Sequence, residues 1–274
     1  MAADDLGMRK RLVTCSDYPK VTRREALAAS VATAGVLALG SAAHSAPATA
    51  DPNSTGRKRW LIVAAHPDDE SKATPLIFAE RKPDDEVVVL IMRLCGEGRL
   101  QDRNSWTREE AIATRTYEMQ QAARFLKAEL RWWLPPHPEN ANIAQTPETV
   151  TKMVGLLREI RPDRIVTHWD EDSHPDHAGT AALIRAALAE LAVPGGMPVY
   201  FWGQPGREQE QPRFIPTQYI DISDPTRLAQ VLWSRFVHRC QTASVTMQSY
   251  LKYFHAHGQK AGVPYAAGYV LEHA

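Results

Sequence analysis

From Trp60 onward, short apolar runs alternate with longer stretches of helical periodicity. The runs are rich in β-branched and aromatic residues and are bounded by proline, glycine or charge, as buried strands are. Strands that alternate with helices form βαβ units, so we expect a Rossmann-like α/β fold: a mostly parallel sheet with helices on both faces. The expected strands are residues 60–66, 86–94, 130–135, 164–169, 198–203 and 217–223, and the expected helices are residues 107–127, 147–161, 178–192 and 225–258, the last broken into two.

The N-terminal part of the chain has a different composition. A basic stretch containing Arg23 and Arg24 is followed by a short alanine-rich apolar run and then by small residues. This is the order of a secretory signal, and the twin arginine is typical of the Tat type. We therefore expect residues 1–50 to be a Tat-type signal peptide and the protein to be exported, to the periplasm or beyond. A frayed amphipathic helix is the alternative. Residues 51–58 are interpreted as a linker, and residues 59–274 as one domain.

Charge, hydropathy and cysteine content limit the partners, the membrane attachment and the disulfides that we expect. The 274 residues carry a formal net charge of zero, which gives no general attraction to nucleic acid or to anionic lipid. Because the sequence has no run of about 18 apolar residues, we expect no stable membrane anchor. Cys95 and Cys240 are too few for a disulfide framework. A disulfide between them in an oxidising compartment is the alternative, but a Tat substrate folds before export, so we expect two thiols.

Two clusters of histidines and carboxylates follow expected strands. "AHPDDE" occupies residues 65–70, and "HWDEDSHPDH" occupies residues 168–177. The carboxyl ends of parallel strands meet at one edge of the sheet, where ligands bind in such folds. Imidazole and carboxylate are zinc ligands, and a catalytic zinc site uses about three of them plus a water. Each cluster contains His-Pro-Asp, in which the proline restricts the backbone and holds its neighbours in place.

Each cluster alone has an ordinary explanation. Asp68 or Asp69 is suited to cap the helix that follows, and His174 and His177 are common loop residues. Two such clusters at two strand ends of the same sheet favour a metal site instead.

These clusters resemble the motifs of a known family. "AHPDDE" together with "DSHPDH", residues 172–177, is similar to the PIG-L/LmbE-like zinc-dependent N-acetylglucosaminyl deacetylases. With weaker matches further along, the resemblance covers residues 60–274 and implies a deacetylase domain with its active site at the carboxyl ends of the strands.

Three weaker segments extend the resemblance. "CGEG" at 95–98 resembles a Gly-Glu loop, with Cys95 in place of an Asn or Arg type of residue. "HRCQ" at 238–241 resembles a helical His-x-Ser-Gln element, with Cys240 in place of serine. "GYVLEHA" at 268–274 resembles a terminal Gly-x-x-x-Glu segment.

The resemblance also implies roles for individual residues. These are zinc ligation by His66, Asp69 and His177, general-base catalysis by Asp68, acid or oxyanion-stabilising catalysis by His174, tuning of that histidine by Asp176, and supporting roles for Glu70 and Asp172. Fe²⁺ is an alternative metal for the same ligands.

The implied roles agree with the chemistry of amide hydrolysis. Zinc lowers the pKa of bound water toward about 7 and polarises the carbonyl. Asp68 can take the proton of the water and pass it to the leaving amine. A protonated His174, favoured by Asp176, would oppose the charge that develops on the carbonyl oxygen.

We therefore expect removal of an N-acetyl or other N-acyl group from a small glucosamine-type sugar or glycoconjugate. An amidase acting on a larger sugar conjugate or glycopeptide, and a non-catalytic zinc-binding or sugar-binding module, are the alternatives. The presence of Asp68 and His174 disfavours the non-catalytic module, because binding alone needs neither residue. A dinucleotide-binding domain is disfavoured because no G-x-G-x-x-G follows the first strand. The candidate substrate contacts are Glu97, Arg99 and Trp169.

Overall fold

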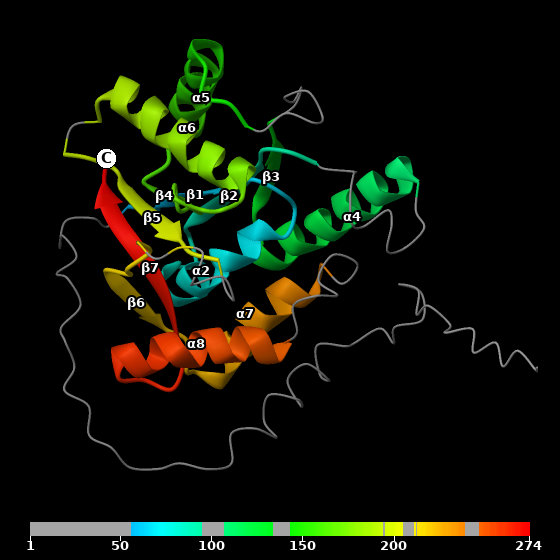
Figure 1. The fold of residues 1–274 in the computed structure, drawn as a ribbon, viewed down its shortest axis with the longest axis vertical. Helices are drawn as coiled ribbons and strands as arrows, with labels where there is room; N and C mark the ends of the chain where they lie inside the picture. Colours follow the sequence, from blue (N-terminus) through cyan, green and yellow to red (C-terminus); the bar gives the residue numbers. More distant parts are fainter. Residues whose placement is uncertain are drawn as a thin grey trace, which may run out of the picture.

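The computed structural model describes residues 56–94, 107–133, 143–193, 195–204, 211, 213–238 and 247–274. Its centre is a seven-stranded sheet in the order β3-β2-β1-β4-β5-β7-β6 (Figure 1). The strands are β1 (Arg59–Ala64), β2 (Glu86–Ile91), β3 (Glu129–Trp132), β4 (Arg164–His168), β5 (Pro198–Trp202), β6 (Gln218–Asp221) and β7 (Ala266–His273). The helices are α2 (Thr74–Glu80), α4 (Arg108–Leu126), α5 (Pro147–Ile160), α6 (Pro175–Leu191), α7 (Pro225–Phe236) and α8 (Met247–Ala261), with a 3-10 turn, η2 (Asp69–Lys72).

The pairing of the strands confirms the predicted mostly parallel α/β fold. Strands β3, β2, β1, β4 and β5 are parallel to one another. β7 is antiparallel to both of its neighbours, β5 and β6. The chain builds outward from β1 in one direction through β2 and β3, and then in the other direction through β4 and β5. The crevice beyond the carboxyl ends of β1 and β4 is therefore the topological switch point of the sheet.

Both faces of the sheet are covered, as its apolar strands require. Side chains alternate along a strand, so Ile62 points to one face and Leu61 and Val63 to the other. Ile62 packs in a core with residues of α2, α4, α7 and α8, whereas Leu61 and Val63 pack with α5 and α6. Figure 1 shows these two groups of helices on opposite sides of the sheet.

The helices agree with the predicted ranges in three places. The helix predicted from residue 107 is α4, and Thr107 and Glu110 form a capping box at its start, with the Thr107 side chain 3.1 Å from the Glu110 amide. α5 begins at Pro147 and ends before Pro162. The helical pattern at 225–258 is indeed divided, into α7 and α8.

Other boundaries differ from the prediction. α6 begins at Pro175 rather than at residue 178, because His174 caps it: the Asp176 amide donates to His174 Nδ1 at 3.2 Å. His177 therefore lies in the first helical turn. The helix α2 and the strand β7 were not predicted, since α2 is too short for a clear period and β7 depends on pairing with two distant strands.

Several sequence-based expectations lie outside the described residues. These are the signal peptide, most of the linker, Glu97, Arg99 and the two cysteines, Cys95 and Cys240. Within the described part of the chain, no helix combines the length and the apolar character needed to cross a membrane.

Candidate active site

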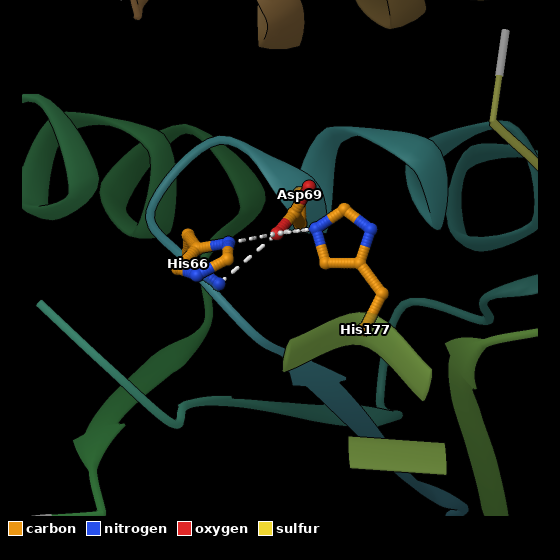
Figure 2. A group of neighbouring side chains, drawn as sticks. All are labelled: His66, Asp69 and His177. Atoms are coloured by element: carbon orange, nitrogen blue, oxygen red, sulfur yellow. Dashed lines mark hydrogen bonds and ion pairs between the residues drawn. The ribbon is translucent and has the colours of Figure 1, made fainter. Parts of the chain in front are cut away.

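The two histidine–carboxylate clusters meet beyond the adjacent ends of β1 and β4. His66, Asp69 and His177 are all buried, and one ligand atom from each lies within 4.8 Å of the others. Asp69 Oδ2 lies 3.2 Å from His66 Nδ1 and 3.3 Å from His177 Nε2 (Figure 2). This group has the composition and spacing of a metal site, and it joins the residues that the sequence argument selected.

Lys72 forms an ion pair with Oδ1, the second carboxylate oxygen of Asp69. Its Nζ lies 2.6 Å from Asp69 Oδ1, so Oδ2 is the oxygen turned toward the two imidazoles. Burial alone would raise the pKa of Asp69, but Lys72 and His177 lower it well below its usual range. The carboxylate is therefore ionised, which is the form that binds a metal.

A buried carboxylate orients His177. Asp172 Oδ2 lies 3.0 Å from His177 Nδ1, and its other oxygen accepts from the His174 amide at 2.8 Å. A hydrogen bond at Nδ1 places the proton there and leaves Nε2 free to face Asp69, as is common for metal-binding histidines. The supporting role of Asp172 stays a prediction, and this contact is the geometry that it requires. The side-chain amide of Gln204 lies 2.6 Å from the same Nδ1.

Asp176 contacts different groups from those expected. Its Oδ2 lies 2.9 Å from His66 Nε2 and 3.0 Å from Arg93, and its Oδ1 accepts from the Ile143 amide at 3.1 Å. Burial would raise the pKa of Asp176, but His66 and Arg93 hold it well below its usual range. Asp176 thus orients His66, and its contact with His174 is made by its backbone amide.

His174 stands at the exposed rim of the group. Its ring centroid lies 4.5 Å from that of His177 and 5.0 Å from that of His66. Partial burial and the nearby His177 and His66 lower its pKa to about 4, although Asp176 acts in the opposite direction. In this geometry the ring is neutral at pH 7 and its Nδ1 accepts a hydrogen bond. The charged imidazolium expected from the sequence does not fit this arrangement, whereas a neutral ring that donates from Nε2 does.

Asp68, the expected general base, lies beside this group with an unusual backbone, φ 110°. Arg235 of α7 donates to its Oδ2 at 2.8 Å and to its carbonyl oxygen at 3.1 Å. Burial and the nearby Asp69 would raise the pKa of Asp68, but the positive charges of Arg235, Arg115 and Lys72 together lower it. Asp68 is therefore an ionised carboxylate at neutral pH, as a general base must be.

Glu70 connects the same loop to the end of α7. Its Oε1 lies 2.6 Å from His238 Nε2, and its Oε2 accepts from the Asp68 amide at 2.9 Å. Both Glu70 and His238 are fully buried. Burial would lower the pKa of His238, but Glu70 raises it. These contacts tie the loop that carries Asp68 and Asp69 to the end of α7, and the supporting role of Glu70 stays a prediction.

Sequence reasoning missed several residues that contact this site. The buried His168 stacks on His177 with 4.1 Å between ring centroids, and it was visible in the second cluster. The other missed residues, which carried no sequence signal, are Lys72, Arg93, Gln204 and Arg235.

Trp169, a predicted candidate for substrate contact, is partly buried against Phe201 and Phe214, with 5.9 Å between ring centroids in each pair.

Comparison with models of known protein families identifies the family of the segment that carries both clusters. A family model described as PIG-L, GlcNAc-PI de-N-acetylase, matches residues 61–188, the segment that carries both clusters. This segment belongs to the PIG-L family. The resemblance inferred from the motifs is therefore confirmed.

Proteins similar to this chain include deacetylases. A 1D-myo-inositol 2-acetamido-2-deoxy-alpha-D-glucopyranoside deacetylase from Mycobacterium leprae (strain Br4923) is 27% identical over 179 residues, covering 57% of this chain and 58% of the relative. The chain thus matches less than two thirds of that relative's length.

Solved structures confirm the fold. The N,N'-diacetylchitobiose deacetylase from Pyrococcus horikoshii has a TM-score of 0.62 and 22% identity, with 78% of this chain and 84% of that chain covered. GalB, the 4-carboxy-2-hydroxymuconate hydratase from Pseudomonas putida KT2440, has a TM-score of 0.63 and 18% identity, with coverage of 79% and 97%. Because a deacetylase and a hydratase share this fold, the activity of this protein must be argued from the site.

Proposed function

We propose that this protein is a metal-dependent hydrolase that removes an N-acetyl group from a glucosamine-type sugar. The observation that carries the proposal is the group formed by His66, Asp69 and His177, with the ionised Asp68 next to it in the same loop. Two imidazole nitrogens and one carboxylate oxygen fit a catalytic zinc site, which keeps a further position open for water or substrate. Fe²⁺ is the alternative metal.

The reaction adds water across the amide bond, so that the carbon–nitrogen bond breaks and acetate and a free amine form. A zinc ion held by His66, Asp69 and His177 would polarise the amide carbonyl and make a water more acidic. Asp68 takes the proton of the attacking water and delivers it to the amine as that group leaves.

His174 stabilises the charge that develops on the carbonyl oxygen. Because its Nδ1 accepts from the Asp176 amide, the proton of the neutral ring is on Nε2. That N–H is a fixed donor at the rim of the site, and one such donor is typically worth about 3–4 kcal/mol in the transition state. The role does not require an imidazolium.

The substrate is proposed to be an N-acetylglucosamine unit alone or in a conjugate. The relative from Mycobacterium leprae acts on an inositol-linked acetamido sugar, and the neighbour from Pyrococcus horikoshii acts on diacetylchitobiose. We propose Trp169 as a platform for a sugar ring, because aromatic faces stack well on sugars and this side chain is only partly buried. A larger glycopeptide is the alternative substrate.

The experiment is a substrate panel with free, inositol-linked, phospholipid-linked and oligomeric N-acetylglucosamine. Acetate and free amine are both quantified, with metal-free protein and with protein reconstituted with Zn²⁺ or Fe²⁺. We expect both products in equal amounts, loss of activity on chelation and recovery on reconstitution. Turnover that survives complete metal removal would refute the metal mechanism. Zinc binding without turnover of any substrate would indicate a binding module instead.

We also propose export through the Tat pathway, directed by residues 1–50. The support is the order of a twin arginine, a weakly apolar run and small residues in that segment.

A further inference from the structure

The backbone of Asp68 is in a conformation that a side chain rarely adopts. The other described non-glycine residues with positive φ are Lys127, Arg161 and Ala192, which have φ of 45–51° and follow the ends of helices. Asp68 has φ 110° and lies before a 3-10 turn at the centre of the site. Such a conformation persists only where surrounding contacts hold it, and it is common where a reacting group must be held in place.

Local contacts hold the backbone of Asp68 but not its carboxylate. The Asp68 amide donates to Glu70 Oε2 at 2.9 Å, and its carbonyl oxygen accepts from Ser71 Oγ at 2.6 Å. Among the described residues, Arg235 supplies the hydrogen bond to the carboxylate, at Oδ2.

Arg235 reaches Asp68 from the last turn of α7. One nitrogen of its guanidinium, Nη1, donates both to Asp68 Oδ2 and to the Asp68 carbonyl oxygen. A single nitrogen that bonds to a residue's backbone and to its side chain fixes the rotation of that side chain. The guanidinium also lies 5.5 Å from the ring centroid of Tyr250 in α8, which restrains the arginine itself. Both partners are largely buried, with side-chain exposures of 12% for Arg235 and 19% for Asp68.

We propose that Arg235 is a positioning residue for proton transfer. It holds the Asp68 carboxylate by Oδ2 and leaves Oδ1 as the oxygen that takes the proton from water. This inference rests on the proposed function, in which Asp68 is the general base. A buried ion pair of this kind contributes little net stability compared with apolar packing, so its placement on the reacting carboxylate is better explained by orientation than by stability.

The test uses Arg235→Ala and Arg235→Lys, with Arg227→Ala as the matched control. Arg227 lies on the same helix, and its guanidinium bonds to the Asp221 carbonyl oxygen at 2.9 Å, at the other end of α7 from the site. We expect Arg235→Ala to lower kcat about 100-fold, the usual effect of a misplaced reacting group, with KM and zinc affinity changed by less than about threefold. We expect Arg235→Lys to recover part of the loss, and Arg227→Ala to match the wild type.

Chemical rescue separates orientation from folding. Millimolar methylguanidine is expected to restore activity to Arg235→Ala, and the same concentration of urea is not. A kcat for Arg235→Ala within about threefold of wild type would overturn the proposal. So would a loss that neither lysine nor methylguanidine restores and that parallels a fall in Tm, because that pattern describes a purely structural ion pair.

A crystal structure of Arg235→Ala keeps this inference distinct from the proposed function. If the wild type releases no acetate from any substrate, the proposed function has failed. The position of Asp68 in the variant is still informative in that case. A carboxylate that rotates away, or a φ that returns to negative values, supports positioning by Arg235. An unchanged Asp68 overturns it.

Discussion

Replacing Asp172 with asparagine should weaken metal binding without touching a metal ligand. Asp172 Oδ2 lies 3.0 Å from His177 Nδ1, and the Asp172 side chain is completely buried. In Asp172→Asn the retained amide oxygen can still accept from the His174 amide, while the new NH₂ group faces the His177 N–H. The imidazole then loses both its acceptor and the negative charge that makes it a stronger ligand.

Loss of such a supporting carboxylate typically lowers metal affinity about 10–100-fold, which equals about 1.4–2.7 kcal/mol of binding free energy. Because the pair is shielded from water, salt screens it weakly, and we expect the upper half of that range. The assay is competition for zinc with a chromophoric chelator. The matched control is Asp170→Asn in the same loop, since Asp170 forms a surface ion pair with Arg185 at 3.0 Å with both side chains 32% exposed. Equal affinity in Asp172→Asn and wild type would refute the argument that this carboxylate orients His177.

Three further predictions concern the base, the loop and the leader. Asp68→Asn should bind zinc like the wild type but lose about 10²–10⁴-fold in kcat; full activity would remove Asp68 as the base. The pKa of His238 is raised above 6.5 in the folded protein, so its contribution to stability is complete below about pH 6.5 and is lost as pH rises through the raised value. Glu70→Gln should remove this fall of Tm with pH, and a Tm profile parallel to that of the wild type would contradict it. Residues 1–50 should direct a folded reporter out of the cell, and the double substitution Arg23→Lys with Arg24→Lys should block export. Equal export by the two leaders would disprove Tat dependence.

Much of the sheet was predictable because it depends on local pattern. β1, β2 and β4 are apolar runs buried on both faces, and such runs stand out in any sequence. The grouping of His66, Asp69 and His177 was predictable for a related reason. Because β1 and β4 are parallel neighbours, the residues that follow them meet at one edge of the sheet. His66 therefore lies near both His177 and Asp176, and its contact with Asp176 spans 110 positions of the sequence.

The residues that were missed depend on packing between helices and the site loop. Arg235 reaches Asp68 across 167 positions, and nothing in the sequence of α7 distinguishes it from a surface arginine. Lys72 is likewise an ordinary residue until η2 turns its side chain onto Asp69. The main contacts of Asp176 were missed for a similar reason. Adjacency in the sequence suggested His174, whose pKa Asp176 does act to raise, whereas the first turn of α6 directs the carboxylate toward His66 and Arg93.

The most direct test of the metal centre is the position of the ion itself. Three overlapping groups of possible ligand residues are present in the described part of the chain, all of them buried except the exposed His174: His66, Asp69 and His177; His66, His174 and Asp176; and His168, Asp172 and His177. Anomalous diffraction at the zinc edge from crystals of the zinc-loaded protein distinguishes them. We expect one peak, bonded to Asp69 Oδ2 and to one nitrogen of each of His66 and His177. A peak in either of the other groups, with Asp69 unbound, would contradict it.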